Sequence, residues 1–338
     1  MIVIDGARGE GGGQVLRSAL SLSACTGQPF RIKNVRAGRQ KPGLMRQHLT
    51  CVRAAEAVCG GSARGAELGG TELTFAPGEP RGGTHRFDVG TAGATPLVFQ
   101  TVLPILLSAD EPSRVTLCGG THTMAAPTLD FVTESFLPPL NAMGADVTVM
   151  PERPGFFPAG GGLWSAEVSP LEAPAPLDLT ERGALLGVTA QAMRANLSGD
   201  ICERELAACA GVLGLDEDAL SHTSHGGPGP GNAVLVRVAC AHHRAVFSDI
   251  GRRGVSAEAV GRRAAGLARG YLEGRAVADE HLADQLLLPL ALFGGGRFTA
   301  SVLSSHFATN AETIGLFLDI RVRTEETGDG WLVEVERG

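Results

Sequence analysis

Lysine is almost missing from this chain of 338 residues, because 27 of its 29 basic residues are arginines. A Walker-type phosphate loop needs a Gly-Lys-Ser/Thr segment, and nucleotidyl transfer through lysine uses a Lys-x-Asp-Gly segment. Neither pattern is present, since the two lysines lie in the sequences Lys33-Asn-Val-Arg and Lys41-Pro-Gly-Leu. If the protein handles ATP, it does so without a motif lysine.

Paired cysteines and long apolar runs are also missing. The seven cysteines are an odd number, and none forms a Cys-x-x-Cys pair, so we expect a reduced compartment and a packing role for each. No stretch approaches 18 uninterrupted apolar residues, and the chain starts at Met1 without a basic-then-apolar leader. We therefore expect a soluble, cytoplasmic protein with no membrane partner.

The charge is unevenly distributed. A net charge of −7 argues against a protein that coats long stretches of nucleic acid. Residues 1–60 nevertheless carry nine basic and three acidic residues, a local charge of +6, which leaves −13 on the rest. A basic site in an acidic body indicates a small polyanionic ligand or the end of a polymer.

Three segments repeat one pattern: small or polar residues, a glutamine, then an apolar helical run. Their glutamines are Gln14, Gln100 and Gln285, and the last two continue alike to a proline four residues later. Each segment is followed by a strand-like stretch, a small-residue turn and a second helix. The pattern predicts an α/β protein built from three layered β-α-β-α-β units, each with a four-stranded sheet and two helices.

The second helices are predicted over 44–59, over 128–143 and from Thr309, where Thr-Asn-Ala-Glu forms a capping box. Strands are predicted over 31–35, 114–117, 145–149 and 331–335. Residues 178–274 break the repeat, and we expect them to form a smaller inserted α/β domain with a helix over 200–213, a strand over 233–238 and a helix over 256–272. The large catalytic domain would then comprise residues 1–177 and 275–338.

The segment Glu10-Gly-Gly-Gly-Gln14 follows a strand and opens a helix. Glycine N–H groups at a helix N-terminus can hold a phosphate. Glu10 could bind a divalent cation, and Arg17 lies two helical turns further on, near the same face. A plain tight turn between strand and helix stays open as the alternative.

A basic cluster surrounds the Pro-Gly turn at residues 42–43, with Arg36 and Arg39 before it and Gln47 and His48 after it. Guanidinium groups hold phosphate oxygens in a bidentate fork, which suits a terminal phosphate. The cluster also sits at a strand end, where layered α/β proteins often place their sites. A solvated basic surface is the alternative.

His306 is predicted to lie in the turn before the helix that starts at Thr309. The positive end of a helix disfavours imidazolium, so it leaves a neutral ring that can attack, and it attracts phosphate. Covalent catalysis through a ring nitrogen is then reasonable, although a structural histidine fits the position as well. The histidine pairs 222/225 and 242/243 lack acidic or cysteine partners at ligand spacing, so we assign them no metal.

Taken together, these segments resemble the RNA 3'-terminal phosphate cyclase family over nearly the full length. The resemblance is carried by the order and spacing of residues 10–18, 36–39 with 41–44, 47–48, 156–162, 282–285 and 305–310. It implies a three-repeat fold with an insert before the last repeat.

The resemblance also implies a reaction in three steps. The histidine matching His306 attacks the α-phosphorus of ATP and carries AMP on a ring nitrogen. AMP then passes to the RNA 3'-phosphate, and the neighbouring 2'-OH displaces it to leave a 2',3'-cyclic phosphate. A divalent cation, Mg²⁺ or Mn²⁺, is the implied cofactor.

By the same resemblance, Glu10 helps place the cation, and a set of polar residues holds phosphates of ATP or RNA: Arg17, Arg36, Arg39, Gln47 and His48. The ATP-binding positions are Gln100, Pro127, Phe131, His281, Leu282, Ala283, Asp284 and Gln285. Pro127 and Phe131 match positions that line the adenine pocket. His281 stands where the family pattern has a tyrosine that stacks on adenine.

Two other readings remain at this stage. The chain could be a non-catalytic relative on the same fold that binds RNA or assists ribosome assembly, although such relatives lack the nucleophilic histidine. It could also be a sugar-acid enolpyruvyl transferase, which is likewise built from repeated β-α units but needs lysines that are scarce here.

Overall fold

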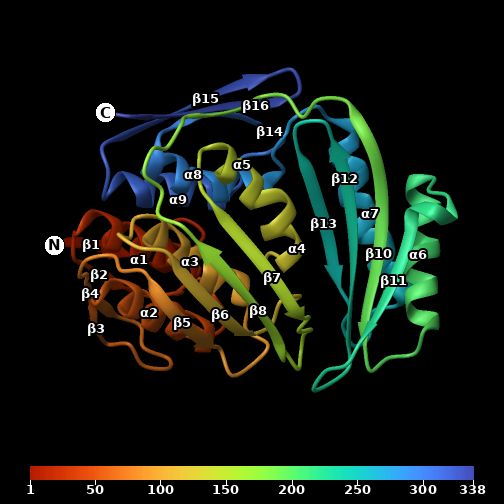
Figure 1. Ribbon diagram of the computed structural model, residues 1–338, viewed down its shortest axis with the longest axis horizontal. Helices are drawn as coiled ribbons and strands as arrows, with labels where there is room; N and C mark the ends of the chain where they lie inside the picture. Colours follow the sequence, from red (N-terminus) through yellow and green to blue (C-terminus); the bar gives the residue numbers. More distant parts are fainter.

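The computed structural model describes residues 1–338 and contains four sheets of four strands each (Figure 1). The N-terminal unit begins with a parallel pair of strands joined through a helix, and two further strands follow its second helix. Its strands pair in the order β1-β2-β4-β3. Its elements are β1 (Ile2–Asp5), α1 (Gln14–Thr26), β2 (Phe30–Lys33), α2 (Arg46–Cys59), β3 (Ser62–Arg64) and β4 (Leu73–Ala76).

The second unit has the same strand order, β5-β6-β8-β7. Its second helix is a composite, in which a π-helical turn separates two α-helical pieces. The elements are β5 (Gly83–Asp88), α3 (Thr95–Leu107), β6 (Ser113–Gly119), α4 (Leu129–Phe131), the π-helical turn Val132–Phe136, α5 (Leu137–Ala142), β7 (Val147–Arg153) and β8 (Gly162–Val168).

The third unit repeats the order again, as β9-β14-β16-β15. In all three sheets the first two strands are parallel and the other neighbours are antiparallel. The predicted threefold repeat is therefore confirmed, with one addition: each unit ends in two strands, and the last inserts between the second and the third. The elements are β9 (Leu177–Leu179), α8 (Glu280–Phe293), β14 (Gly296–Ala300), α9 (Ser305–Gly315), β15 (Ile320–Thr327) and β16 (Gly330–Arg337).

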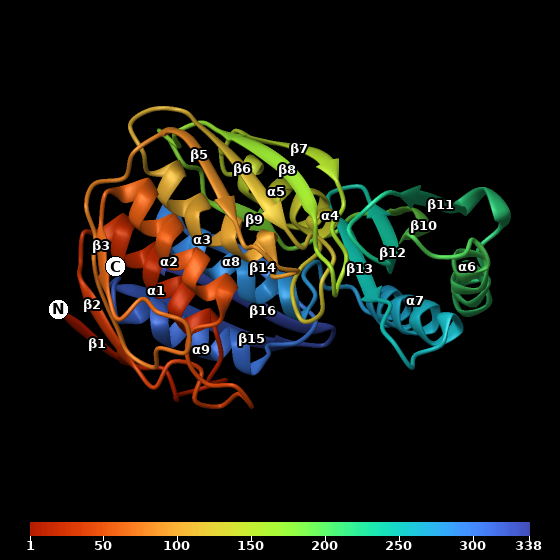
Figure 2. The same cartoon turned by 90° about the horizontal axis from the view of Figure 1, so that it is seen from below.

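The remaining sheet, β11-β10-β12-β13, lies between β9 and α8 in the sequence and has its own apolar core. It projects from the rest of the molecule in Figures 1 and 2. The predicted boundary at residue 178 falls inside β9, and the division of the chain into two domains stays a prediction. The elements are β10 (Leu185–Ala195), α6 (Asp200–Leu213), a 3₁₀ turn (Glu217–Ala219), β11 (Leu220–His225), β12 (Gly231–Cys240), β13 (Arg244–Ile250) and α7 (Ala257–Glu273).

The two ends of this inserted segment meet at one side chain. The Thr299 hydroxyl on β14 donates to the Thr180 carbonyl at 3.0 Å and accepts from the Val277 backbone N–H at 3.1 Å. The chain therefore leaves and re-enters the third unit at the same place.

Helices fill the middle of the three-unit body. Figure 2 shows α1, α2, α3 and α8 enclosed between sheets on three sides. One core of 64 buried residues runs through all three units. All seven cysteines are unpaired, and five of them are buried. None of the helices is long and apolar enough to cross a bilayer.

Two helix predictions need correction. The helix expected from Thr309 begins at Ser305, because Ser304 caps it by accepting the Phe307 N–H at 3.3 Å. His306 therefore lies in the first helical turn and not before it, while the Thr309 hydroxyl donates to the Ser305 carbonyl at 2.7 Å. The continuous helix expected over 128–143 is interrupted by the π-helical turn.

We predict that Gly261→Ala destabilises the inserted segment. A Cβ at Gly261 on α7 would lie 2.2 Å from the Glu205 carbonyl oxygen of α6, so the two helices would have to separate. Overpacking of this kind costs about 1–3 kcal/mol. Gly266 on the same helix has nothing within 4 Å of its Cβ position. Gly266→Ala should therefore raise the free energy of unfolding by up to about 1 kcal/mol. Denaturant unfolding of both variants distinguishes them, and equal effects would contradict the close packing.

Candidate active site

Three helices meet at a chain of hydrogen bonds that ends on His306. His306 Nδ1 lies 2.8 Å from Gln14 Oε1, and Gln14 Nε2 donates to Asp284 Oδ1. His306 lies on α9, Gln14 on α1 and Asp284 on α8. The two hydrogen bonds therefore depend on how these three helices pack together. Gln14 and Asp284 are buried, and the His306 side chain is 45% exposed.

Neighbouring polar groups hold this chain in place. Asn310 Nδ2 donates to the Asp284 carbonyl at 3.0 Å, and the Ser18 hydroxyl donates to Asn310 Oδ1 at 2.7 Å. Asn310 follows His306 by one helical turn, so it ties α9 to both α1 and α8. Buried polar groups that are fully paired in this way fix one arrangement.

The hydrogen bonds determine which nitrogen of His306 is free. A carboxylate only accepts, so Asp284 orients the amide of Gln14 with its N–H₂ toward Asp284 and its oxygen toward His306. Nδ1 must then carry the ring proton, and Nε2 keeps its lone pair. Burial raises the pKa of Asp284 above its usual range, although the hydrogen bond from Gln14 and the charge of Arg17 act in the opposite direction.

Glu10 lies beside His306 and has one free oxygen. Its backbone N–H donates to the Thr309 hydroxyl at 3.1 Å, and its Oε2 forms an ion pair with Arg39. Oε1 is buried without a hydrogen-bond partner and lies 3.8 Å from His306 Nδ1. A single carboxylate oxygen completed by water and substrate phosphates is how Mg²⁺ is commonly held, so Glu10 fits a cation site of that kind.

The glycines between Glu10 and Gln14 allow close approach. A Cβ at Gly12 would lie 2.3 Å from Glu10 Oε2, and one at Gly13 would lie 2.2 Å from His48 Nε2. Any larger residue would push these side chains away. The predicted phosphate-type turn is thus also the surface against which Glu10 and His48 pack.

Arg17 and His48 form the inner wall of the basic cluster. Burial lowers the pKa of the Arg17 guanidinium, against the opposing charges of Asp284 and Glu10. Burial and the nearby charges of Arg17 and Arg36 lower the pKa of His48 to about 3, so its ring is neutral at physiological pH. Its Nδ1 accepts the Met45 N–H at 3.3 Å, which leaves Nε2 as a donor.

Two predicted phosphate-binding residues are already engaged. Arg36 donates to the carbonyls of Lys41 and Gly43, at 2.6 and 2.9 Å, and so closes the loop that carries Arg39. Gln47 Oε1 accepts the Ala94 N–H at 3.1 Å and links the first unit to the second. Their direct contact with a phosphate stays a prediction.

The predicted ATP-binding residues form a second group around α8. Gln100 Nε2 donates to Gln285 Oε1, which joins α3 to α8. His281 is exposed at the start of α8, whereas Leu282 and Ala283 point into the core and can offer only backbone atoms to a ligand. Phe131 is buried and Pro127 half-buried, in a segment continuous with the π-helical turn that packs on α8.

Sequence reasoning missed the role of Gln14. Its position at the start of α1 was noted, but its partners lie 270 and 292 residues away, so no local pattern could reveal them. The long-range contacts of Asn310, Ser18 and Thr309 could not be predicted for the same reason. A buried glutamine as the first residue of a helix is the one signal that could have indicated a specific partner.

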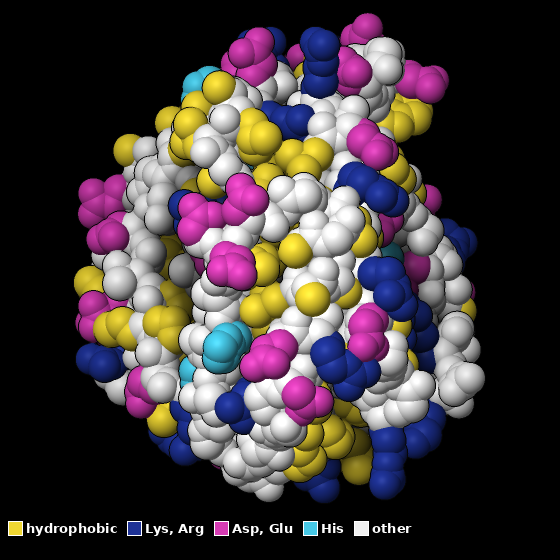
Figure 3. All heavy atoms as spheres, turned by 90° about the vertical axis from the view of Figure 1, so that its right-hand side faces the viewer, with side chains coloured by type: hydrophobic (Ala, Val, Ile, Leu, Met, Phe, Trp, Pro, Cys, Tyr) yellow, Lys and Arg dark blue, Asp and Glu magenta, His cyan; other side chains and the backbone are white.

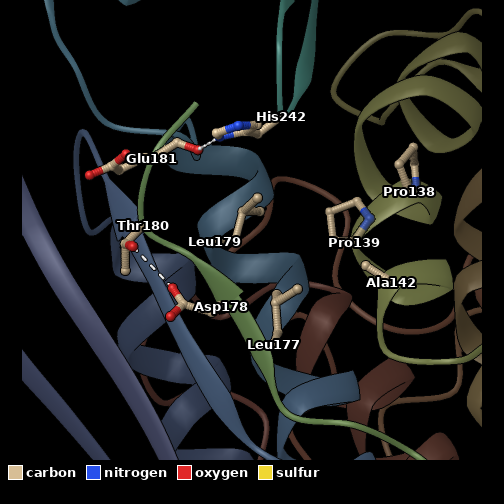
Figure 4. A pocket seen from close by; sticks show the side chains of 9 residues that line it. All are labelled: Pro138, Pro139, Ala142, Leu177, Asp178, Leu179, Thr180, Glu181 and His242. Carbon is tan, nitrogen blue, oxygen red and sulfur yellow. Dashed lines mark hydrogen bonds between the residues drawn. The ribbon is translucent and has the colours of Figure 1, made fainter. Parts of the chain in front are cut away.

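A cavity lies away from these residues. Its volume is about 410 Å³, and it opens between α5, β9 and the inserted segment. Figure 4 shows Asp178, Glu181 and His242 at its rim, with Pro139 and Leu179 facing inward. It contains none of the predicted site residues.

Comparison with known proteins gives one consistent family. The family model described as RNA 3'-terminal phosphate cyclase matches residues 8–324. Proteins named RNA 3'-terminal phosphate cyclase from Koribacter versatilis and Salmonella enteritidis are each 48% identical to this chain. The first match covers 96% of this chain and 92% of the relative, and the second covers 99% and 98%.

Among solved structures, the enolpyruvyl transferase NikO from Streptomyces tendae aligns with 99% of this chain and 65% of its own, at 12% identity. Its TM-score of 0.27 is too low to bear on the fold or on the reaction. The sequence relatives, by contrast, match this chain over nearly its full length. The chain belongs to the RNA 3'-terminal phosphate cyclase family.

Proposed function

We propose that this protein uses ATP to convert the 3'-terminal phosphate of RNA into a 2',3'-cyclic phosphate, with AMP carried on His306. The observation that carries the proposal is the free Nε2 of His306, whose other nitrogen, Nδ1, is hydrogen-bonded to Gln14, which Asp284 orients. The names of the relatives and the family match support the overall activity. We also propose a cytoplasmic location, in keeping with seven unpaired cysteines.

In the first step, Nε2 attacks the α-phosphorus of ATP. The new N–P bond replaces the bond from the α-phosphorus to the bridging oxygen, and pyrophosphate leaves. Nε2 has no proton to lose, so no base is required. The ring becomes positively charged as it attacks. The hydrogen bond from Nδ1–H to Gln14 Oε1 then becomes stronger, which stabilises the transition state.

In the second step, an oxygen of the RNA 3'-phosphate attacks the same phosphorus and the N–P bond breaks, which returns His306 to its neutral form. The 3'-phosphate is now joined to AMP. In the third step, the adjacent 2'-OH attacks the phosphorus of that 3'-phosphate, its proton passes to solvent, and the bond from this phosphorus to AMP breaks. The reacting hydroxyl is already in the same molecule, so proximity accounts for much of the rate.

The polar groups around His306 suit the phosphates of both substrates. Arg17 forms no ion pair in the protein, and Arg39 and the Nε2–H of His48 face the same glycine turn. Glu10, through its free Oε1, would hold the divalent cation. When bound, such a cation neutralises phosphate charge and makes the α-phosphorus easier to attack.

The nucleoside of ATP would bind against α8 and the segment 127–131. Gln100 and Gln285 offer amide groups to its edge, and Pro127 with Phe131 an apolar face. His281 would stack from the exposed side, where a tyrosine occurs in the family pattern. A histidine ring is smaller and more polar than a phenol, so we propose weaker discrimination between purine bases at this position.

We predict that the wild-type protein, incubated with α-labelled ATP and Mg²⁺, forms a protein–AMP adduct that is stable in alkali and labile in acid, as expected for a phosphorus–nitrogen bond. His306→Ala should abolish the label. His222→Ala, which changes an exposed histidine on β11, should label like wild type. Label retained by the His306 variant would refute the nucleophile.

We further predict that Gln14→Leu slows adduct formation about 10- to 100-fold, because it removes one hydrogen bond to a group that becomes charged. The apparent KM for ATP should change little. Gln28→Leu is the matched control, since Gln28 lies just beyond the other end of α1 and its side chain bonds only to the Phe317 carbonyl. Single-turnover labelling measures both, and an equal loss in the two variants would contradict a specific role for Gln14.

For Arg39→Ala, we predict that adduct formation with ATP persists while kcat/KM for 3'-phosphorylated RNA falls about 10- to 100-fold, the worth of a charge-assisted contact to phosphate. Arg31→Ala removes an exposed arginine paired with Glu72 and should have no such effect. Cyclisation assays on a short labelled RNA decide between them. Unchanged cyclisation by the Arg39 variant would remove this residue from the RNA-end site.

A further inference from the structure

A half-buried group of charges joins the inserted segment to the second unit. Arg237 on β12 donates to Asp130 Oδ1 at 2.6 Å, to Glu134 Oε1 at 2.8 Å and to Gln191 Oε1 at 3.0 Å. The side chains of Arg237, Asp130 and Glu134 are each about one-fifth exposed. A guanidinium that uses all three of its nitrogens on fixed partners has little freedom to move.

Asp130, a partner of Arg237, also takes part in closing a loop. His122 Nε2 donates to Asp130 Oδ2 at 2.9 Å, and the Leu129 N–H donates to the Thr121 carbonyl at 3.1 Å. These two contacts bracket residues 123–128, a loop in which Ala125 adopts a φ of +53°. A non-glycine residue in that region is held there by its surroundings and not by preference.

The closed loop leads directly into the proposed nucleoside pocket. Pro127 lies inside the loop, and Phe131 follows Asp130 in the chain. Glu134 lies in the π-helical turn that comes next and packs against α8. Single π-helical turns are frequent at functional sites, where they re-aim side chains.

The loop is anchored behind His122 as well. The His122 ring is buried and stacks on Phe156 with centroids 5.3 Å apart. The Gly155 N–H donates to the Thr121 hydroxyl at 2.8 Å. Burial alone would raise the pKa of Asp130, but His122 and Arg237 outweigh it and lower that pKa, so the carboxylate is held in its charged form.

The outer face of the inserted segment offers no comparable feature. Figure 3 shows basic and acidic side chains interspersed on this side of the molecule. Several are paired with each other, including Arg204 with Glu258 and Arg263 with Asp249. Arg237 is the one arginine of the segment that contacts two carboxylates of another unit. Arg244 adds a single contact to Glu134 at 3.1 Å.

We infer that Arg237 is a positioning residue through which the inserted segment holds the loop 122–131, and with it the apolar face of the nucleoside pocket, in the shape that binds ATP. The inference rests on the proposed function for the identity of the ligand. It gives the inserted segment a role in ATP binding that involves no direct contact with ATP. The His306, Gln14 and Asp284 chain lies on other helices and does not depend on it.

The expected consequence is a separation between binding and chemistry. Without Arg237, the carboxylates of Asp130 and Glu134 lose the guanidinium group that lies between them. The loop that contains Pro127 then becomes more mobile. ATP should then bind more weakly, while the attack by His306 proceeds normally once ATP is bound. Loss of coupling through a residue of this kind commonly changes an affinity by about tenfold.

The test uses the full-length protein and single-turnover labelling by α-labelled ATP. Arg237→Gln should raise the apparent KM for ATP about tenfold and leave the rate of adduct formation at saturating ATP within about twofold of wild type. Arg237→Lys keeps the positive charge but lacks the planar guanidinium that bonds several partners at once. It should restore part of the affinity for ATP. Arg244→Gln removes the exposed contact to the same Glu134 and should match wild type.

A second measurement keeps the inference testable without ATP. Hydrogen exchange of the free protein should quicken at the backbone amides of residues 121–131 in Arg237→Gln, while α6 and α7 stay as protected as in wild type. Should Arg237→Gln fail to fold, Glu134→Gln, which keeps the shape and removes one carboxylate, should raise the KM in the same direction.

Three outcomes separate the possibilities. An unchanged KM with unchanged exchange over 121–131 overturns the inference, and so does a fall in the saturated rate with an unchanged KM. Absence of an AMP adduct in the wild-type protein overturns the proposed function instead, whereas the exchange experiment still decides whether Arg237 holds the loop.

Discussion

The amide group of Gln14 is the contact on which the site depends. Asp284 orients this amide, and the amide oxygen in turn accepts the proton of His306 Nδ1. Asp284 therefore determines which ring nitrogen stays free, although it does not contact the ring. The contact requires α1, α8 and α9 to be correctly packed together. The first unit must therefore pack against the third, because α1 belongs to the first unit and α8 and α9 belong to the third.

The threefold repeat explains why the same architecture can hold different chemistry at corresponding places. After its second strand, the first unit has the loop with Arg36 and Arg39, the second has Thr121 and His122, and the third has Ser304 and His306. The first of these segments thus carries cations, the second a buried histidine that pairs with Asp130, and the third the half-exposed imidazole at the start of α9. The sheets set where these turns lie, and the residue types in each turn set what they do.

Local patterns in the sequence predicted much of this arrangement. The helix Asp200–Leu213 has the predicted bounds because Gly214, with a φ of +67°, ends it locally. The repeat was visible because Gln100 and Gln285 precede matching apolar runs, and both occupy the same position in their helices. The predicted start of α9 at Thr309 is wrong because Ser304 caps the helix earlier in the chain.

Contacts between distant segments could not be predicted in this way. Arg237 and Asp130 lie 107 residues apart, and nothing in either sequence neighbourhood announces the other. The same holds for Gln14 and for the engagement of Arg36 with backbone carbonyls, which depends on the turn that its own φ of +56° creates. Sequence patterns identify candidate residues, and packing decides which atoms of them stay free.

Thr180 and Val277 both form hydrogen bonds with the Thr299 hydroxyl, and this affects how the sequence can evolve. Because the two ends of the inserted segment already lie side by side, its length contributes little to the entropy of closing the third unit. Lengthening, shortening or exchanging the segment would leave the register of β9 against β14 intact. The segment can therefore vary among descendants of a common ancestor while the remainder of the fold keeps its connectivity.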